Sequence, residues 1–284
     1  MRVLVPTDCS DLAAIALKPA KLLAQKFDVE IVALKVVNAP VDAVFDENGE
    51  LTDHEEFDAS VYRKEVAEGA IKVQDWAKQH ECSVEPLVRS GLMIESILKV
   101  IEEERIDMVI MHSDITSGLK KMVHGPIVER IVLNSKVPVL TVKDYFDSFN
   151  NIAFANNFRR YDVRIGMVKK IQEAFNSKLH LIRVNTPRKF MSHDEAMFGM
   201  EAFAKAHDLK NVEFHHINDK KIDRALIDFC KIYKIDLMTI GSKQRKGLIS
   251  VMRGCPSKEI VNQMEFPVLT FRSKSRKKYT YGIH

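Results

Sequence analysis

A glycine-punctuated loop after an apolar run carries residues that could hold a phosphate. Residues 235–240 (IDLMTI) have the length and composition of a buried parallel strand, and Gly241, Gly247 and Gly254 follow them. Glycine lets a backbone turn tightly and approach a ligand, and a helix that begins after Gly254 would point free N–H groups at an anion. Alone the pattern is weak, because glycines after a strand are more often plain turns.

The same pattern occurs earlier in the chain. Residues 106–110 (IDMVI) form a similar apolar run, followed by SGLKKMVHGPIVERIVLNSKVPVLTV, and the later copy ends KGLISVMRGCPSKEIVNQMEFPVLTF. Both copies have Ile-Asp at the start of the strand, Gly-Leu in the loop, a further glycine (Gly125 and Gly254) and a closing Pro-Val-Leu-Thr strand. This internal repeat predicts two halves with one fold.

Length and composition agree with two domains. The chain has 284 residues, of which 46% are hydrophobic and 29% charged, as in a globular protein. Its apolar runs are shorter than the roughly 18 residues that a membrane span requires. We predict domains over residues 1–145 and 150–272 and a basic tail over 273–284. The opening MRVLVPTD enters a strand without the apolar stretch of a signal peptide, so we expect a cytoplasmic protein.

Strands alternate with helices through both halves. This predicts an α/β fold of two tandem doubly wound parallel five-stranded sheets, Rossmann-like, with right-handed crossovers and ligands at the carboxyl ends of the strands. The acidic segment 42–58 is interpreted as a solvated excursion rather than a lid. Strands are expected at 2–6, 30–37, 83–88, 106–110, 151–155, 178–184, 212–216 and 235–240, with a closing strand in each half. Helices are expected from the Thr7–Ser10 turn to about residue 26 and at 62–79, 94–104, 162–174, 194–206 and 222–232.

Val-Pro-Thr-Asp-Cys-Ser at residues 5–10, together with the repeated loop, resembles the tandem universal stress proteins. The resemblance covers nearly the whole chain and implies an adenine nucleotide alpha hydrolase-like fold. Some members of that family bind ATP through the loop glycines and a hydroxyl residue, and others have an altered loop and do not bind it. The cofactor that the resemblance implies is therefore ATP with Mg²⁺, and no cofactor is firmly expected.

In the first half, the resemblance implies an intact nucleoside end and a damaged phosphate end. Pro6, Thr7 and Asp8 match the positions that face the adenosine, and Val36 matches the residue whose backbone reads the adenine. Gly125 matches the last loop glycine. However, His112 and Ile115 replace the first two glycines, and Pro126, which has no N–H to donate, replaces the hydroxyl residue.

In the second half, the loss is reversed. Gly241 and Gly254 match, Gln244 replaces the middle glycine, and Cys255 keeps its N–H but lacks the hydroxyl group. Ala155, Asn156 and Asn157 stand where Pro-Thr-Asp belongs, and Asn157 can still hydrogen-bond but carries no charge. Val184 and Ser242 complete the candidate nucleotide-binding set.

These substitutions favour a non-catalytic stress-response regulator in which neither half binds ATP tightly. One alternative is an adenine-nucleotide sensor, chiefly through the second loop, where Lys243, Arg245, Lys246 and Arg253 could meet phosphates. The other is a slow ATP hydrolase, although Asp8 is the only well-placed acid and no catalytic set emerges.

Other chemistry is less favoured by the residues. No metal site is predicted, since His112 and His124 have no acidic or cysteine partner at ligand spacing. Cys255 is interpreted as an inert thiol rather than a redox sensor. The basic run 272–278 is interpreted as a solvated tail, so neither a membrane nor a specific nucleic acid is expected as a partner. The resemblance implies an intrachain pseudo-dimer of the two halves, and two chains could pair again as a homodimer.

Overall fold

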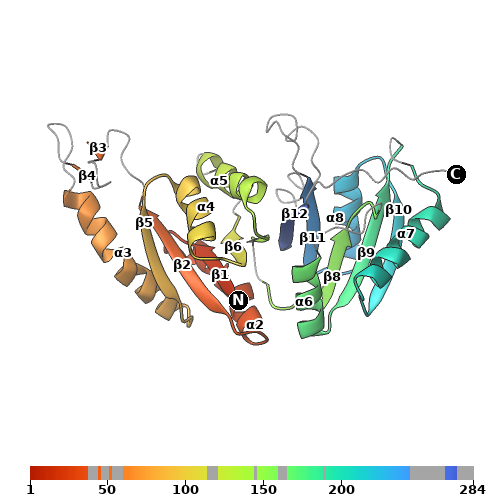
Figure 1. Cartoon of the computed structure of the whole chain (residues 1–284), viewed down its shortest axis with the longest axis horizontal. Helices are drawn as coiled ribbons and strands as arrows, with labels where there is room; N and C mark the ends of the chain where they lie inside the picture. The colour runs from red at the N-terminus through yellow and green to blue at the C-terminus, as the bar shows by residue number, and fades with distance from the viewer. Residues whose placement is uncertain are drawn as a thin grey trace. The chain divides into compact units, whose positions relative to one another are not determined.

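The computed structural model describes residues 1–37, 44–45, 51–52, 60–113, 121–143, 146–158, 165–187, 190–243 and 266–273. The chain divides into two compact units, the first running from Met1 to Ser148 and the second beginning at Phe149. Each unit contains a parallel sheet flanked by helices (Figure 1). None of the helices in these ranges has the length and apolar character that a membrane span requires.

The first unit is built on five parallel strands in the order β7-β6-β1-β2-β5. The strand order reverses between β1 and β6, which is where ligands of such sheets usually bind. The central strands are almost continuously apolar because both faces of the sheet are covered. The strands are β1 (Arg2–Pro6), β2 (Glu30–Val37), β5 (Glu85–Ser90), β6 (Met108–His112) and β7 (Val139–Val142).

The first helix of this unit differs from the sequence prediction. We expected one helix to about residue 26, but the structure has two, α1 (Asp11–Ala14) and α2 (Leu17–Ala24). Pro19 explains the break, because it has no N–H to donate to Ile15 and its ring clashes with the carbonyl group of that residue. The remaining helices are α3 (Ser60–Gln79), α4 (Met93–Glu103) and α5 (Lys121–Asn134), of which α4 and α5 cover the apolar cluster around Leu4 and Val109.

The second unit repeats the topology, with the strand order β10-β9-β8-β11-β12. Its strands are β8 (Asn151–Ala155), β9 (Lys178–Asn185), β10 (Val212–Asn218), β11 (Leu237–Lys243) and β12 (Val268–Ser273). Its described helices are α6 (Gly166–Phe175), α7 (His193–Ala206) and α8 (Ile222–Ile232). The predicted doubly wound parallel sheets are therefore confirmed in both halves.

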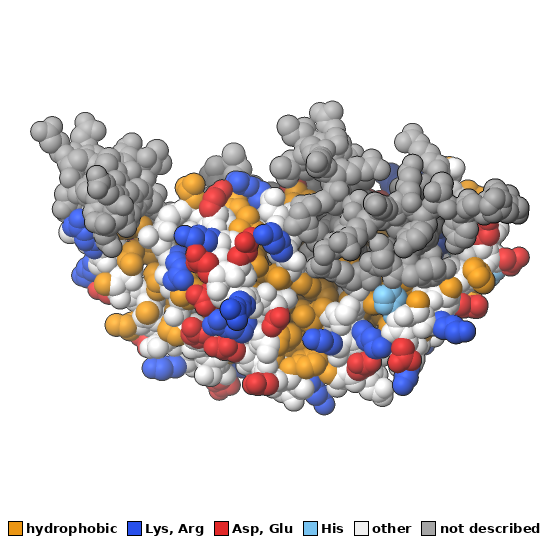
Figure 2. Space-filling view, in the orientation of Figure 1, with side chains coloured by type: hydrophobic (Ala, Val, Ile, Leu, Met, Phe, Trp, Pro, Cys, Tyr) orange, Lys and Arg blue, Asp and Glu red, His pale blue; other side chains and the backbone are white. Residues whose placement is uncertain are grey.

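Two segments that lack a regular hydrophobic pattern lie largely outside the described residues. Within the acidic segment 42–58, β3 (Val44–Phe45) and β4 (Leu51–Thr52) form a short antiparallel pair, and the rest lies outside the described residues. The basic tail beyond residue 273 also lies outside them. On the face shown in Figure 2, basic and acidic side chains are interspersed over the described surface, in agreement with the modest net charge of +4.

Candidate functional site

In the first unit, the predicted Pro-Thr-Asp residues lie together at the carboxyl end of β1. The Thr7 N–H donates to the Leu34 carbonyl oxygen (2.9 Å), which continues the β1–β2 ladder past Pro6. Thr7 Oγ1 accepts from the Cys9 N–H (2.9 Å), and Asp8 Oδ1 accepts from the Ser10 N–H (3.0 Å). The turn is therefore held by its own side chains.

The same turn is joined to two helices. Ser10 Oγ accepts from the Ala13 N–H (3.2 Å) and so caps α1. The indole Nε1 of Trp76, in α3, donates to the Ser10 carbonyl oxygen (3.0 Å). Val36 lies near the end of the adjacent strand β2, half-buried against the apolar cluster and opposite Arg89 of β5. The predicted nucleoside-side residues are thus gathered at one edge of the sheet.

The loop side of the first unit differs from the prediction at Gly125. We expected Gly125 and Pro126 in a loop, but the structure places both inside α5, which begins at Lys121. A glycine costs a helix only about 1 kcal/mol relative to alanine, so its presence does not by itself mark a loop. At the end of β6, His112 Nε2 lies 3.0 Å from the Lys143 carbonyl oxygen. Ile115 lies outside the described residues.

In the second unit, the corresponding strand end is occupied by the chain's own side chains. The Asn156 N–H donates to the Ile182 carbonyl oxygen (3.1 Å), so Asn156 stands where Thr7 does and Asn157 where Asp8 does. Arg183, only 2% exposed, donates through Nη1 to the Asn157 carbonyl oxygen (2.5 Å). Phe158, with a left-handed φ of 49°, is buried against Phe203.

The glycine that opened the predicted phosphate loop belongs to a strand instead. Gly241 and Ser242 lie in β11, paired with Phe271 and Arg272 of β12. A Cβ atom on Gly241 would lie 3.2 Å from the Phe271 ring, so the missing side chain makes room for that ring. The loop prediction was wrong here because the sequence does not show which ring packs beside the strand. Gly254 and Cys255 lie outside the described residues, and Val184 is half-buried in β9.

The comparisons with known proteins agree with this architecture. The model of the Universal stress protein family matches residues 1–143, half of the chain. The chain belongs to this family. Universal stress protein MJ0531 of Methanocaldococcus jannaschii is 27% identical over 142 residues, which are 50% of this chain and 81% of that protein. Universal stress protein MJ0577 of the same organism is 29% identical over 152 residues, which are 50% of this chain and 94% of that protein.

A solved structure extends the likeness of fold to both halves. The crystal structure of a universal stress protein from Archaeoglobus fulgidus aligns with a TM-score of 0.74, covers 96% of each chain and is 20% identical. At that identity the alignment bears on the fold alone. The second half of this universal stress protein therefore shares the fold even though the family model matches only the first.

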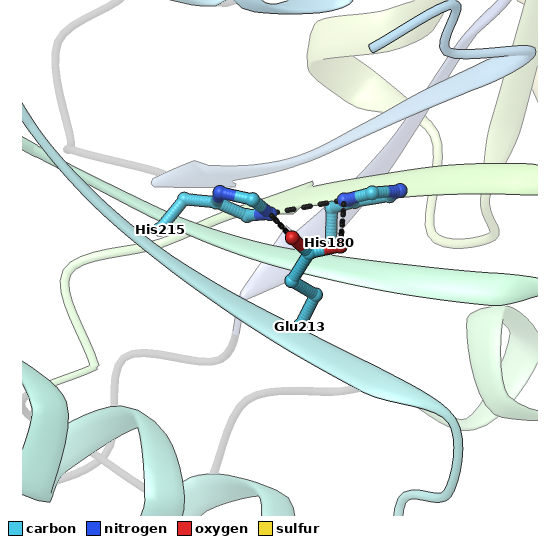
Figure 3. Close-up of side chains that lie close together, drawn as sticks. All are labelled: His180, Glu213 and His215. Carbon is cyan, nitrogen blue, oxygen red and sulfur yellow. Dashed lines mark hydrogen bonds and ion pairs between the residues drawn. The ribbon is translucent and has the colours of Figure 1, made fainter.

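A polar cluster that we did not predict lies between β9 and β10 in the second unit. It consists of His180, Glu213 and His215, whose side chains point toward one another (Figure 3). His180 Nδ1 lies 3.0 Å from His215 Nε2 and 3.6 Å from Glu213 Oε2, and His215 Nε2 lies 3.9 Å from Glu213 Oε1. The Lys178 ammonium group lies 2.5 Å from Glu213 Oε2.

Burial keeps both imidazoles of this cluster neutral. Burial, reinforced by the neighbouring His215 and Lys178, lowers the pKa of His180 to about 4, although Glu213 acts in the opposite direction. Burial also lowers the pKa of His215. The hydrogen bond from Lys178 lowers the pKa of Glu213, which is therefore a carboxylate at neutral pH. The cluster presents two neutral nitrogen donors and one carboxylate.

One signal for this cluster was present in the sequence. Glu213 and His215 are two residues apart in VEFHHIN, so they lie on the same face of a strand. His180 lies in KLHLIRVN, on the strand that pairs with β10, directly opposite Glu213. Only the register of β9 against β10 brings the three residues together, and the sequence does not specify that register.

Proposed function

We propose that this universal stress protein is a non-catalytic stress-response regulator in which neither half binds ATP tightly. The observation that carries the proposal is the hydrogen bond from the buried Arg183 guanidinium to the carbonyl oxygen of Asn157. Asn157 stands where the family motif has its aspartate. This part of the strand end is already used for a contact within the chain, so a nucleoside would have to compete with it.

In the first half, the support comes from the loop side of the site. His112 stands at the position of a family glycine, and its ring contacts the Lys143 carbonyl oxygen. The imidazole therefore occupies space where a glycine would let the backbone approach a phosphate. The turn at Thr7 and Asp8 retains the residues that match the nucleoside end. Any remaining nucleotide affinity of the first half is therefore expected at this turn, and it is expected to be weak because the loop side is altered.

The test is a calorimetric titration of the nucleotide-stripped full chain with ATP and Mg²⁺, with AMP as a control. We expect no binding with a dissociation constant below about 1 mM, which corresponds to a binding free energy of only about −4 kcal/mol. Two matched variants locate any heat that does appear. Asp8→Asn gives the first half the residue of the second, and Asn157→Asp makes the reverse exchange.

The alternatives give different results in the same experiment. Micromolar binding at one site per chain that Asp8→Asn leaves unchanged would replace the proposal with an adenine-nucleotide sensor in the second half. Metal-dependent ATP turnover that Asp8→Ala abolishes would replace it with a slow hydrolase. The proposal also includes a cytoplasmic location, the pairing of the two halves within the chain and a homodimer. The molar mass in solution, measured by analytical ultracentrifugation, tests the homodimer.

A further inference from the structure

The cluster of His180, Glu213 and His215 lies between β9 and β10, beside Phe229 of α8. His180 is the third residue of β9, and Glu213 and His215 are the second and fourth of β10. Of the candidate nucleotide residues of this unit, Asn157 follows β8, Val184 lies in β9, and Gly241 and Ser242 lie in β11. None of the three cluster residues is among these candidates, so a ligand at the cluster would be held by other residues than a nucleotide.

The spacing of the three side chains fits a small transition-metal ion. A tetrahedral zinc ion with ligands at about 2.0–2.1 Å places its ligand atoms about 3.3 Å apart. The two imidazole nitrogens lie 3.0 Å apart, and the ligand atoms of all three residues lie within 4.8 Å of one another, so the carboxylate would have to move toward the imidazoles to complete the geometry. Two imidazoles and one carboxylate are a donor set that zinc uses, with a fourth position left for water.

The surroundings of the cluster would hold such ligands in place. His180 is 2% exposed, and its Nε2 is buried with no hydrogen-bond partner among the described residues, so the polar contacts of this ring are made through Nδ1, within the cluster. Phe229 and Tyr233 pack against both imidazole rings and limit their rotation. The Glu213 side chain is 38% exposed, which leaves a route for an ion from solvent.

We propose that His180 Nδ1, His215 Nε2 and the Glu213 carboxylate form a binding site for a divalent transition-metal ion of the zinc type. The hard ions Mg²⁺ and Ca²⁺ prefer sets of oxygen ligands and are not expected to bind here. The fourth position, facing the exposed side of Glu213, is taken by water.

Lys178 gives the proposal a second, opposite test. Its ammonium group is ion-paired with Glu213 Oε2, so it competes with a metal ion for the carboxylate. Replacing it with the uncharged methionine should leave the carboxylate to the ion. A loss of affinity on removing Glu213 and a gain on removing Lys178 would together be specific to this cluster.

The experiment is a zinc titration of the chelator-treated full chain, without nucleotide, against a competing chromophoric chelator. Glu213→Gln and His215→Gln are each expected to weaken the affinity for one zinc ion per chain by at least about tenfold, and Lys178→Met to strengthen it. His216→Gln is the matched control, because His216 is adjacent in sequence but pairs with His193 on the other face of β10. That variant should leave the affinity unchanged.

Either of two titration results would overturn the site. One is the absence of zinc binding by the wild-type chain, and the other is an affinity that Glu213→Gln and His215→Gln both leave unchanged. Circular dichroism establishes that each variant is folded before it is compared. X-ray absorption of the zinc complex supplies a direct measurement, with two imidazole nitrogens expected at about 2.0–2.1 Å. A first coordination shell without imidazole would also reject the assignment.

Discussion

The two units share one acid but carry different side chains at two neighbouring, equivalent positions of their sheets. In the first unit, Val32 pairs with Glu85 and Leu34 with Leu87. In the second, His180 pairs with Glu213 and Ile182 with His215. Val32 and Leu87 are thus replaced by two imidazoles, and the acid alone is common to both. The fold fixes where these side chains lie but leaves their chemistry open.

The two units surround the shared acid with different charged groups. Glu85 is ion-paired with Arg2 at 2.6 Å, and Arg2 also contacts Glu30 and Glu104. Glu213 is ion-paired with Lys178, which stands where Glu30 does at the start of the second strand. The first unit surrounds one cation with three acids, whereas the second surrounds one acid with a lysine and two imidazoles.

The largest effect is expected at the glycine of β11. Gly241 faces Phe271, whereas the equivalent pair in the first unit is His112 and Val142. Gly241→Val should destabilise the chain by about 2–3 kcal/mol in chemical denaturation, because the new side chain meets the Phe271 ring. The double variant Gly241→Val, Phe271→Val should lose at least about 1 kcal/mol less of the free energy of unfolding than the sum of the losses in the two single variants. Strictly additive losses would show that Gly241 is not needed to make room for the Phe271 ring.

The next effect tests the exchange of imidazoles for aliphatic side chains. His180→Val should cost about 2 kcal/mol in the presence of a chelator, because it leaves the His215 ring without its hydrogen-bond partner. The double variant His180→Val, His215→Leu copies the first unit and should lie within about 1 kcal/mol of wild type, since both partners are removed together. A double variant less stable than the His180→Val single variant would contradict the comparison.

A smaller effect is expected from the two cations. Arg2→Gln leaves three carboxylates near one another without their common partner and should cost about 1–2 kcal/mol in denaturant melts. Lys178→Gln should cost less, about 0.5 kcal/mol, because it removes a single half-exposed pair. Added salt should narrow the difference between the two variants. An equal cost for both variants would mean that three carboxylates around one cation stabilise the chain no more than a single ion pair does.

The smallest effect compares the helix caps of the two units. Ser192 and Glu195 form a reciprocal capping box at the start of α7, a helix of 14 residues. Ser192→Ala should cost about 1 kcal/mol. Ser10→Ala at the four-residue α1 should cost about half of that, because the short helix contributes little to be lost. Reversed values would show that the turn at Ser10 matters more than the helix it caps.

The sequence predicted the elements of the fold well and the site only in part. Residues 151–155 and 222–232 have the expected bounds, because an apolar run and an amphipathic pattern are local properties. Pro19 was a visible break that we overlooked. Gly241 and the His180 cluster depend on which residues face one another across neighbouring strands, and no local pattern encodes that register. The turn at Thr7 was found because its hydrogen bonds are local.

The contact between α3 and the turn after β1 has an optical consequence. Trp76 is the single tryptophan of the chain, and its indole N–H donates to the Ser10 carbonyl oxygen at the end of that turn. Indole emission shifts when this hydrogen bond is lost or the ring becomes hydrated. The tryptophan fluorescence of the unlabelled protein therefore reports on the surroundings of Trp76, which include the Thr7–Ser10 turn, without a contribution from any indole in the second unit.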